Sequence, residues 1–69
     1  MQLPEAPNAV LRAAAVGRVL GVHRQTIGTW WRRGWLPYRC LPNGTRFMFG
    51  ADLRDWIESR HARRLLRAV

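Results

Sequence analysis

The spacing of hydrophobic positions divides the first half of the chain into two helical segments. Apolar residues recur at helical spacing over 10–20 and again over 24–33, as they do on one face of an amphipathic helix. Each segment is followed by a glycine, Gly21 or Gly34, the residue that best adopts the left-handed conformation at a helix C-terminus. The pattern therefore predicts two helices joined by a tight turn, the first of them capped by Asn8.

The middle of the chain has the pattern of a β-hairpin. Aromatic and other strand-forming residues occupy 38–41 and 46–49, on either side of the dipeptide Asn43-Gly44. Asn-Gly is a strong signal for a hairpin turn, because both residues tolerate positive φ. A third amphipathic helix is predicted to begin at Ala51 and to continue through the C-terminal tail.

This order of elements predicts a mainly α fold with a short β-hairpin. Two helices joined by a tight turn and followed by a β-ribbon describe a winged helix-turn-helix, with three helices and a wing. We predict a flexible N-terminal arm over 1–9, the winged domain over 10–58 and a basic helical tail over 59–69.

The charge of the chain narrows the choice of partners. The 69 residues carry twelve basic and four acidic side chains, for a net charge of +8, and all twelve basic residues are arginine. Seven arginines and no acidic residue lie between Ala6 and Ala51. A small, foldable and strongly basic chain favours a polyanionic partner, either nucleic acid or an anionic membrane. We attribute the lack of lysine to codon usage in a GC-rich genome, so each arginine is judged by its own position.

Several other classes of protein are disfavoured. The lone Cys40 has no partner for an intramolecular disulfide, and no Cys/His set has the spacing of a zinc site, so no metal and a reducing cytoplasm are expected. The N-terminus lacks the pattern of a signal peptide, and no apolar run approaches a membrane span. His23 and His61 have no Ser or Cys at motif spacing, and no glycine-rich phosphate loop exists. We therefore expect no enzymatic activity, catalytic residue, cofactor or small-molecule ligand.

The second predicted helix has one apolar and one polar side. At 100° per residue, Ile27, Trp30 and Trp31 fall together on the side that packs. The opposite side carries hydrogen-bond donors and small residues without an acid, which suits the major groove of DNA. The DNA-binding residues predicted on this helix are Arg24, Gln25, Thr26, Gly28, Thr29, Arg32 and Arg33. Gly28 has two open interpretations, which are close approach of the backbone to bases and drift in a marginal helix.

The chain resembles a known family of DNA-binding domains. The segments Ala14–Ile27 and Arg33–Pro37, with Trp30 between them, resemble the MerR-like, excisionase-type DNA-binding domain. The segment Pro42–Met48, followed by Asp52-Leu53, is similar to the wing of that family. The resemblance implies that the second helix enters the major groove and that the wing reaches the backbone or the minor groove beside it. The wing residues that would then contact DNA are Arg39, Asn43, Gly44, Thr45 and Arg46.

Within this family, the short chain resembles a phage or plasmid excisionase, also called a recombination directionality factor. Such a protein is a non-catalytic accessory factor in the bacterial cytoplasm, associated with the nucleoid. It binds repeated duplex DNA sites cooperatively with neighbouring copies of itself, bends the DNA and helps an integrase to excise an element. The alternative is a small MerR-like transcriptional regulator. A cationic membrane-active protein is a more remote alternative, because it would require one long amphipathic helix.

Some side chains have a predicted place outside the DNA-binding face. Trp30 and Trp56 are expected in the core, Cys40 on an inward-facing strand position and His61 on the helix surface. Trp35 either covers the wing or is exposed for a partner. The residues predicted to contact another protein, either a neighbouring copy or the recombinase, are Leu65, Leu66 and Val69. The alternative is that this tail folds back onto the core or frays.

Overall fold

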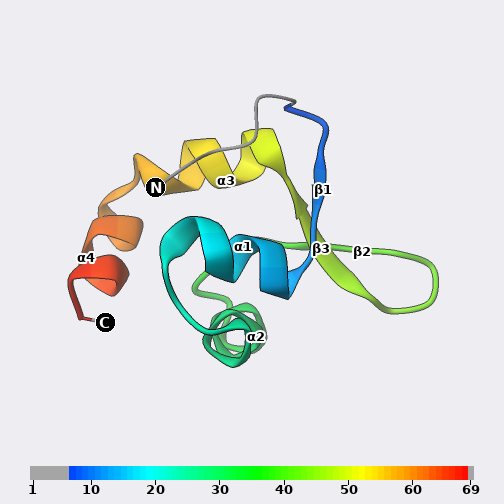
Figure 1. Cartoon of the computed structure of the whole chain (residues 1–69), viewed down its shortest axis with the longest axis horizontal. Coiled ribbons are helices and arrows are strands. Elements are labelled where there is room, and N and C mark those ends of the chain that lie inside the picture. The colour runs from blue at the N-terminus through cyan, green and yellow to red at the C-terminus, as the bar shows by residue number, and fades with distance from the viewer. Residues whose placement is uncertain (1–6, 69) are drawn as a thin grey trace.

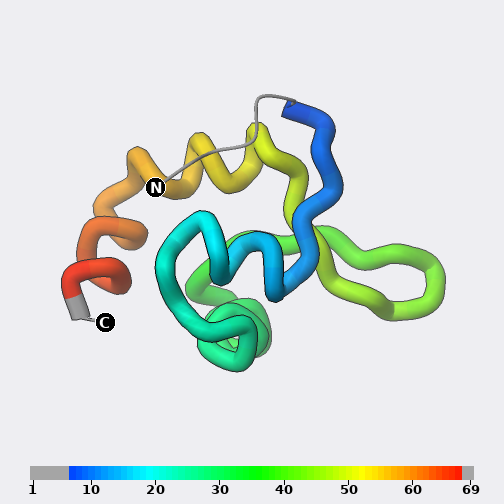
Figure 2. Tube along the Cα trace, in the orientation of Figure 1, coloured from blue at the N-terminus to red at the C-terminus, as the bar shows by residue number. Residues whose placement is uncertain are grey.

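In the computed structural model, which describes residues 7–68, four helices pack beside a three-stranded antiparallel sheet (Figure 1). In chain order the elements are β1 (Val10–Leu11), α1 (Ala13–Leu20), α2 (Arg24–Arg33), β2 (Arg39–Cys40), β3 (Arg46–Phe49), α3 (Gly50–Ile57) and α4 (Arg60–Ala68). The loop between β2 and β3 projects from one end of the molecule, and α4 lies at the opposite end (Figure 2). The chain is thus a small, compact α/β protein.

The sheet has the strand order β1-β3-β2, so that β3 pairs with both other strands. Val10 pairs with Phe49 and Leu11 with Met48. The prediction that Val10 and Leu11 belong to the first helix is therefore wrong. Their backbone groups pair with an edge of β3 that would otherwise stay open. Periodicity within one segment carries no information about such a distant strand.

In the segment that contains the first two helices, the predicted start of the first helix is wrong and the other predicted boundaries are confirmed. α1 begins at Ala13 after the extended residue Arg12, whose side chain makes no capping hydrogen bond. Asn8 lies in a turn before β1, so its predicted role as a helix cap is wrong. Gly21 and Gly34 end α1 and α2 in the left-handed conformation, with φ of 75° and 76°. The bounds predicted for the second helix are confirmed.

The prediction of one continuous third helix is also wrong, because the helix is interrupted between Ile57 and Arg60. The Ser59 hydroxyl donates a hydrogen bond to the carbonyl of Trp56 at 2.6 Å. The same oxygen accepts the backbone N–H of Ala62 at 3.1 Å. Ser59 thereby closes the end of α3 and caps the start of α4. The predicted fold of three helices is corrected to four, and α4 runs at an angle to α3 (Figure 1).

The core lies between the helices and the inner face of β3. Its largest fully buried side chains are Val16, Ile27, Leu36, Met48 and Leu53. The predicted core positions of Trp30 and Trp56 are confirmed, and their ring centroids lie 6.2 Å apart. The indole N–H of Trp56 donates to the backbone carbonyl of Trp35 at 3.3 Å, which ties α3 to the segment that follows α2.

Four side chains outside the predicted DNA-binding face can be compared with their predictions. Leu65 and Leu66 are half-buried and pack against the core from α4, which is the alternative given for this tail. Their predicted contact with a partner stays a prediction, and Val69 lies outside the described residues. Cys40 is exposed rather than packed inward, because β2 is an edge strand of only two residues. His61 is exposed as predicted.

Candidate nucleic-acid interface

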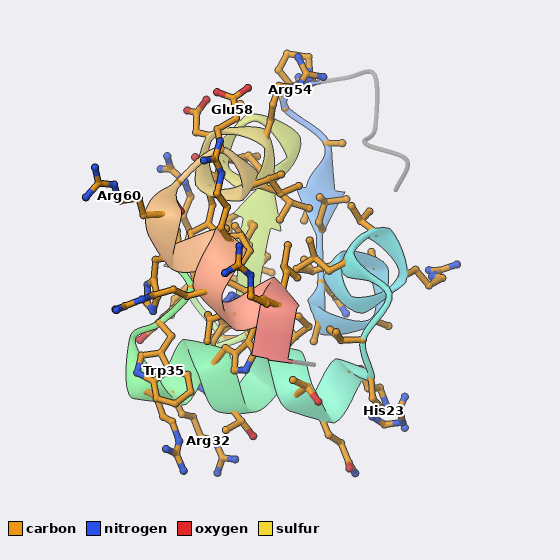
Figure 3. All side chains as sticks on the ribbon, turned by 90° about the vertical axis from the view of Figure 1, so that its left-hand side faces the viewer. His23, Arg32, Trp35, Arg54, Glu58 and Arg60 are labelled. Carbon is orange, nitrogen blue, oxygen red and sulfur yellow. The ribbon has the colours of Figure 1, made fainter. Side chains whose placement is uncertain are left out.

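The two sides of α2 are separated as the sequence predicts. Ile27, Trp30 and Trp31 are buried against the core. On the other side, four side chains are exposed, namely Arg24, Gln25, Arg32 and Arg33, and three residues are half-buried, namely Thr26, Gly28 and Thr29. Figure 3 shows α2 along one edge of the molecule, with Arg32 extending away from the body. The helix therefore presents one continuous polar side to solvent.

Two hydrogen bonds order this polar side. The Thr29 hydroxyl donates to the Gln25 carbonyl at 3.1 Å. The same oxygen accepts from Nη2 of Arg32 at 3.3 Å. Thr29 is predicted to contact DNA directly. Its hydroxyl oxygen also orients the guanidinium of Arg32, so the structure adds a second role for this residue. At the start of the helix, Nδ1 of His23 accepts the N–H of Gln25 at 3.0 Å and caps α2.

The predicted wing residues form the turn between β2 and β3. The side-chain oxygen of Asn43 accepts the N–H of Thr45 at 3.0 Å, and Gly44 has a φ of 88°. That conformation favours glycine, so these residues first of all build the turn. Arg46 follows at the start of β3, where it is exposed and its guanidinium lies 5.3 Å from the Tyr38 ring centroid. Of this group, Arg46 offers the charge for contact with a phosphate.

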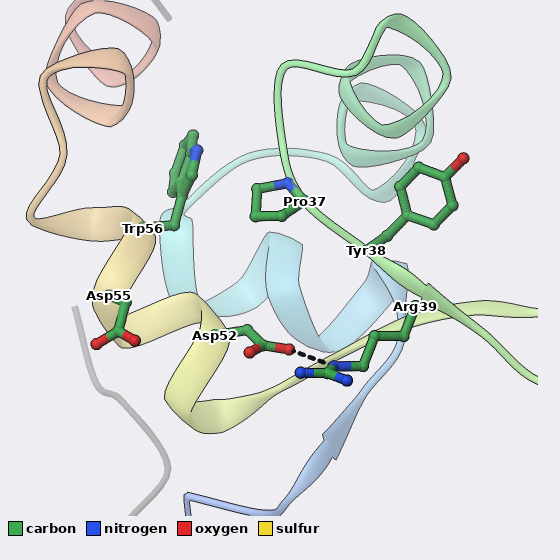
Figure 4. Close-up of a pocket in the computed structure, with 6 residues that line it drawn as sticks. All are labelled: Pro37, Tyr38, Arg39, Asp52, Asp55 and Trp56. Atoms are coloured by element: carbon green, nitrogen blue, oxygen red, sulfur yellow. Dashed lines mark hydrogen bonds and ion pairs between the residues drawn. The ribbon is translucent and has the colours of Figure 1, made fainter.

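Arg39 differs from Arg46 because it is already paired. Its Nε donates to Oδ2 of Asp52 at 3.0 Å (Figure 4). Its guanidinium also lies 5.0 Å from the Phe49 ring centroid. The hydrogen bond between Arg39 and Asp52 lowers the pKa of the Asp52 carboxyl and raises the pKa of the Arg39 guanidinium. Asp52 also accepts the N–H of Phe49 at 3.3 Å at the start of α3. Arg39 therefore joins the hairpin to α3, and its charge is partly neutralised for DNA contact.

Next to this ion pair lies an open pocket of about 520 Å³, lined by Pro37, Tyr38, Arg39, Asp52, Asp55 and Trp56 (Figure 4). Two carboxylates face it, and they would repel a phosphate. The described acidic residues are Asp52, Asp55 and Glu58, which all belong to α3 or its C-terminal end. The fourth, Glu5, lies outside the described residues. None of the described acidic residues therefore belongs to α2.

Two exposed aromatic side chains lie beside arginines near the interface, and neither pair was predicted from the sequence. Trp35 is 37% exposed and Tyr38 is 41% exposed. The guanidinium of Arg33 lies 5.0 Å from the Trp35 ring centroid, at the C-terminal end of α2. Stacking on an aromatic face holds a guanidinium in place without neutralising it. The spacing Arg33-Gly34-Trp35 was the signal in the sequence, since residues on either side of a left-handed glycine are brought together.

Within residues 7–68, no group of three His, Cys, Asp or Glu side chains is arranged to hold a metal ion. No helix in the described part of the chain has both the length and the apolar character needed to cross a membrane. Comparisons of the chain with models of protein families, with curated proteins and with solved structures found no match. A proposal about function therefore depends on the charge and hydrogen-bonding groups of the exposed side chains.

Proposed function

We propose that the chain binds duplex DNA as a winged helix-turn-helix, with α2 in the major groove and the β2–β3 hairpin as the wing. The observation that carries the proposal is the polar side of α2, where arginine and glutamine are exposed without an acid. Arg24, Arg32 and Arg33 are exposed there, and none of them forms an ion pair with an acidic side chain of residues 7–68. A helix with such a side fits the width of the major groove.

The side chains divide into two roles in this proposal. Arg24 and Gln25 lie in the first turn of α2, where the recognition helices of helix-turn-helix proteins contact base edges. Arginine pairs with guanine and glutamine with adenine through two hydrogen bonds each. Arg32, Arg33 and Arg46 contact phosphates and hold the helix in register.

The biological role that we propose is that of an excisionase in the bacterial cytoplasm. Its partners would be repeated DNA sites, neighbouring copies of the chain and a site-specific recombinase. This finer role is supported by the sequence resemblance, and in particular by the segments Ala14–Ile27 and Pro42–Met48. The membrane-active alternative is disfavoured, because the longest helix in the described residues, α2, has ten residues.

The salt dependence of binding tests the DNA-binding proposal. Three exposed arginines, Arg32, Arg33 and Arg46, are proposed to neutralise one phosphate each. Three such contacts give a slope of roughly −3 for log K against log salt. Fluorescence anisotropy with a labelled duplex of about 20 base pairs, or two helical turns, measures this slope. Arg46→Gln should reduce its magnitude by about 0.9. Affinity that does not change with salt would refute this mode of binding.

An excision assay distinguishes the proposed role from the regulator alternative. A plasmid that carries the two attachment sites of the element is incubated with the integrase encoded beside the chain's gene, with and without the chain. An excisionase should increase the excised product, and the double variant Arg24→Ala/Gln25→Ala should abolish the increase. If DNA binding is intact but excision is unchanged, the small MerR-like regulator becomes the better description.

A further inference from the structure

The strongest positive charge outside the proposed interface lies on α4. Nine residues form this helix, and four of them are arginines, namely Arg60, Arg63, Arg64 and Arg67. All four are exposed and together line one shallow hollow. On the opposite side, Ala62 is fully buried and Leu65 and Leu66 pack against the core. We call the four side chains the α4 arginine face.

None of these four arginines forms an ion pair with an acidic side chain of the described residues. α4 contains no acidic residue, and the ion pair found within residues 7–68 joins Arg39 to Asp52. The pairs Arg60–Arg64 and Arg63–Arg67 are each four residues apart, so like charges are neighbours on the helix surface. Such pairs repel each other and destabilise a helix. A bound polyanion would offset this repulsion by attracting both arginines of a pair.

The α4 arginine face and the polar side of α2 point in different directions. Both helices turn their apolar sides to the same core, so their polar sides face away from it. In Figure 1, α2 is seen end-on at the bottom of the molecule and α4 lies at its left edge. In the perpendicular view of Figure 3, Arg60 extends sideways from the upper part of the molecule, whereas Arg32 extends downward from α2. A straight duplex against α2 would therefore pass below the α4 arginine face.

We infer that the α4 arginine face binds the phosphate backbone of a second duplex segment, so that one chain bridges two DNA segments. The inference rests on the proposed function, because the first segment is the one held by α2. The face lacks the mixed donors and acceptors of the α2 side, since its exposed residues are four arginines and His61. Contacts of this kind go to phosphates and carry no sequence information. The second segment is accordingly bound without sequence preference.

Capture of two duplexes tests the inference. One duplex of about 20 base pairs is immobilised, the protein is bound, free protein is washed away, and a fluorescent duplex of unrelated sequence is added. Native mass spectrometry of the protein with both duplexes free in solution should show one chain with two duplexes. The variant R60Q/R64Q should reduce capture of the second duplex by about ten-fold and change affinity for a single duplex by less than about three-fold.

A charge-matched control separates the α4 arginine face from overall charge. R12Q/R18Q also removes two exposed arginines, one before and one within α1, and should leave capture of the second duplex unchanged. Equal losses in the two double variants would overturn the inference, as would capture only by complexes with two chains. A large loss of single-duplex affinity in R60Q/R64Q would also overturn it, because the face would then bind the first duplex. If the wild-type chain binds no duplex at all, the proposed function fails as well.

Discussion

The two glycines in the middle of α1 and α2 lie in opposite surroundings. A Cβ atom added to Gly17 of α1 would lie 2.6 Å from the carbonyl oxygen of Val22 and 3.4 Å from the backbone nitrogen of Arg24. A Cβ atom added to Gly28 of α2 would meet no atom within 4 Å. Gly17 is needed where α1 meets the turn, whereas nothing in the fold requires Gly28.

The difference separates two regions of the segment that contains α1 and α2. Both glycines reduce helix propensity by about 1 kcal/mol relative to alanine, so they are equivalent by local preference. Around Gly17, the backbone of the turn comes so close that only a hydrogen atom fits. Around Gly28, the space is open to solvent on the side of α2 that we propose enters the major groove. We therefore expect changes in the first region to affect stability and changes in the second to affect binding.

The largest expected effect is that of Gly17→Ala. The added methyl group meets backbone rather than a flexible side chain, so α1 and the turn must move apart. We expect the free energy of unfolding to fall by about 1–3 kcal/mol, as for other overpacked sites. Urea unfolding followed by tryptophan fluorescence measures this change. A variant as stable as the wild type would show that the turn yields at no cost.

A second comparison is between residues proposed to contact base edges and a residue proposed to contact the DNA backbone. Arg24→Ala and Gln25→Ala should each cost roughly 1–3 kcal/mol of binding free energy at one or two base positions, if the contacts are bidentate. Arg46→Ala should weaken binding to all sequences, because a wing arginine contacts backbone or narrow minor groove. Binding to a library of randomised duplexes measures both effects. A change of base preference in Arg46→Ala with unchanged affinity for random DNA would contradict these roles.

Gly28→Ala tests directly whether the open space is reserved for DNA. The unfolding free energy should rise by up to about 1 kcal/mol, because alanine favours the helix and meets no neighbour. Affinity for duplex DNA should fall about ten-fold, or 1.4 kcal/mol, if the backbone at this position approaches bases closely. Anisotropy and urea unfolding on the same preparation give both numbers. Unchanged affinity would support the interpretation of Gly28 as drift in a marginal helix.

The smallest expected effect concerns Asp52, which joins the hairpin to α3. Its pKa is lower in the folded chain because Arg39 donates a hydrogen bond to it. The stabilisation is therefore present above the pKa of the unfolded chain, about 4, and is lost as the pH falls through the lower folded value. Relative to Asp52→Asn, the wild type should be more stable by about 0.5–1 kcal/mol at neutral pH.

The control for this prediction is Asp55→Asn on the same helix, because the exposed Asp55 side chain forms no ion pair with another of residues 7–68. Urea unfolding at a series of pH values should show the wild-type advantage over Asp52→Asn shrinking in acid. An advantage over Asp52→Asn that does not change with pH would mean that the ion pair has no part in it.

Where a feature depended on neighbouring residues in the chain, the sequence predicted it well. The ends of α1 and α2 follow from Gly21 and Gly34, and the hairpin turn follows from Asn43-Gly44. The polar side of α2 follows from its period, since Ile27 is buried. These signals are conformational preferences of single residues or the repeat of one helix, so they can be read without a fold.

The features that could not be predicted from the sequence depend on contacts between distant segments. Val10 and Leu11 pair with β3 some forty residues later, which overrides the helical spacing that includes them. Arg39 and Arg46 look alike in the sequence, but only Arg39 reaches Asp52 on α3. The directions of the α2 side and the α4 arginine face likewise follow from how the helices pack. By itself the sequence determined which residues share a helix or turn, and packing decided which of their charges remain available, because pairing requires proximity in space.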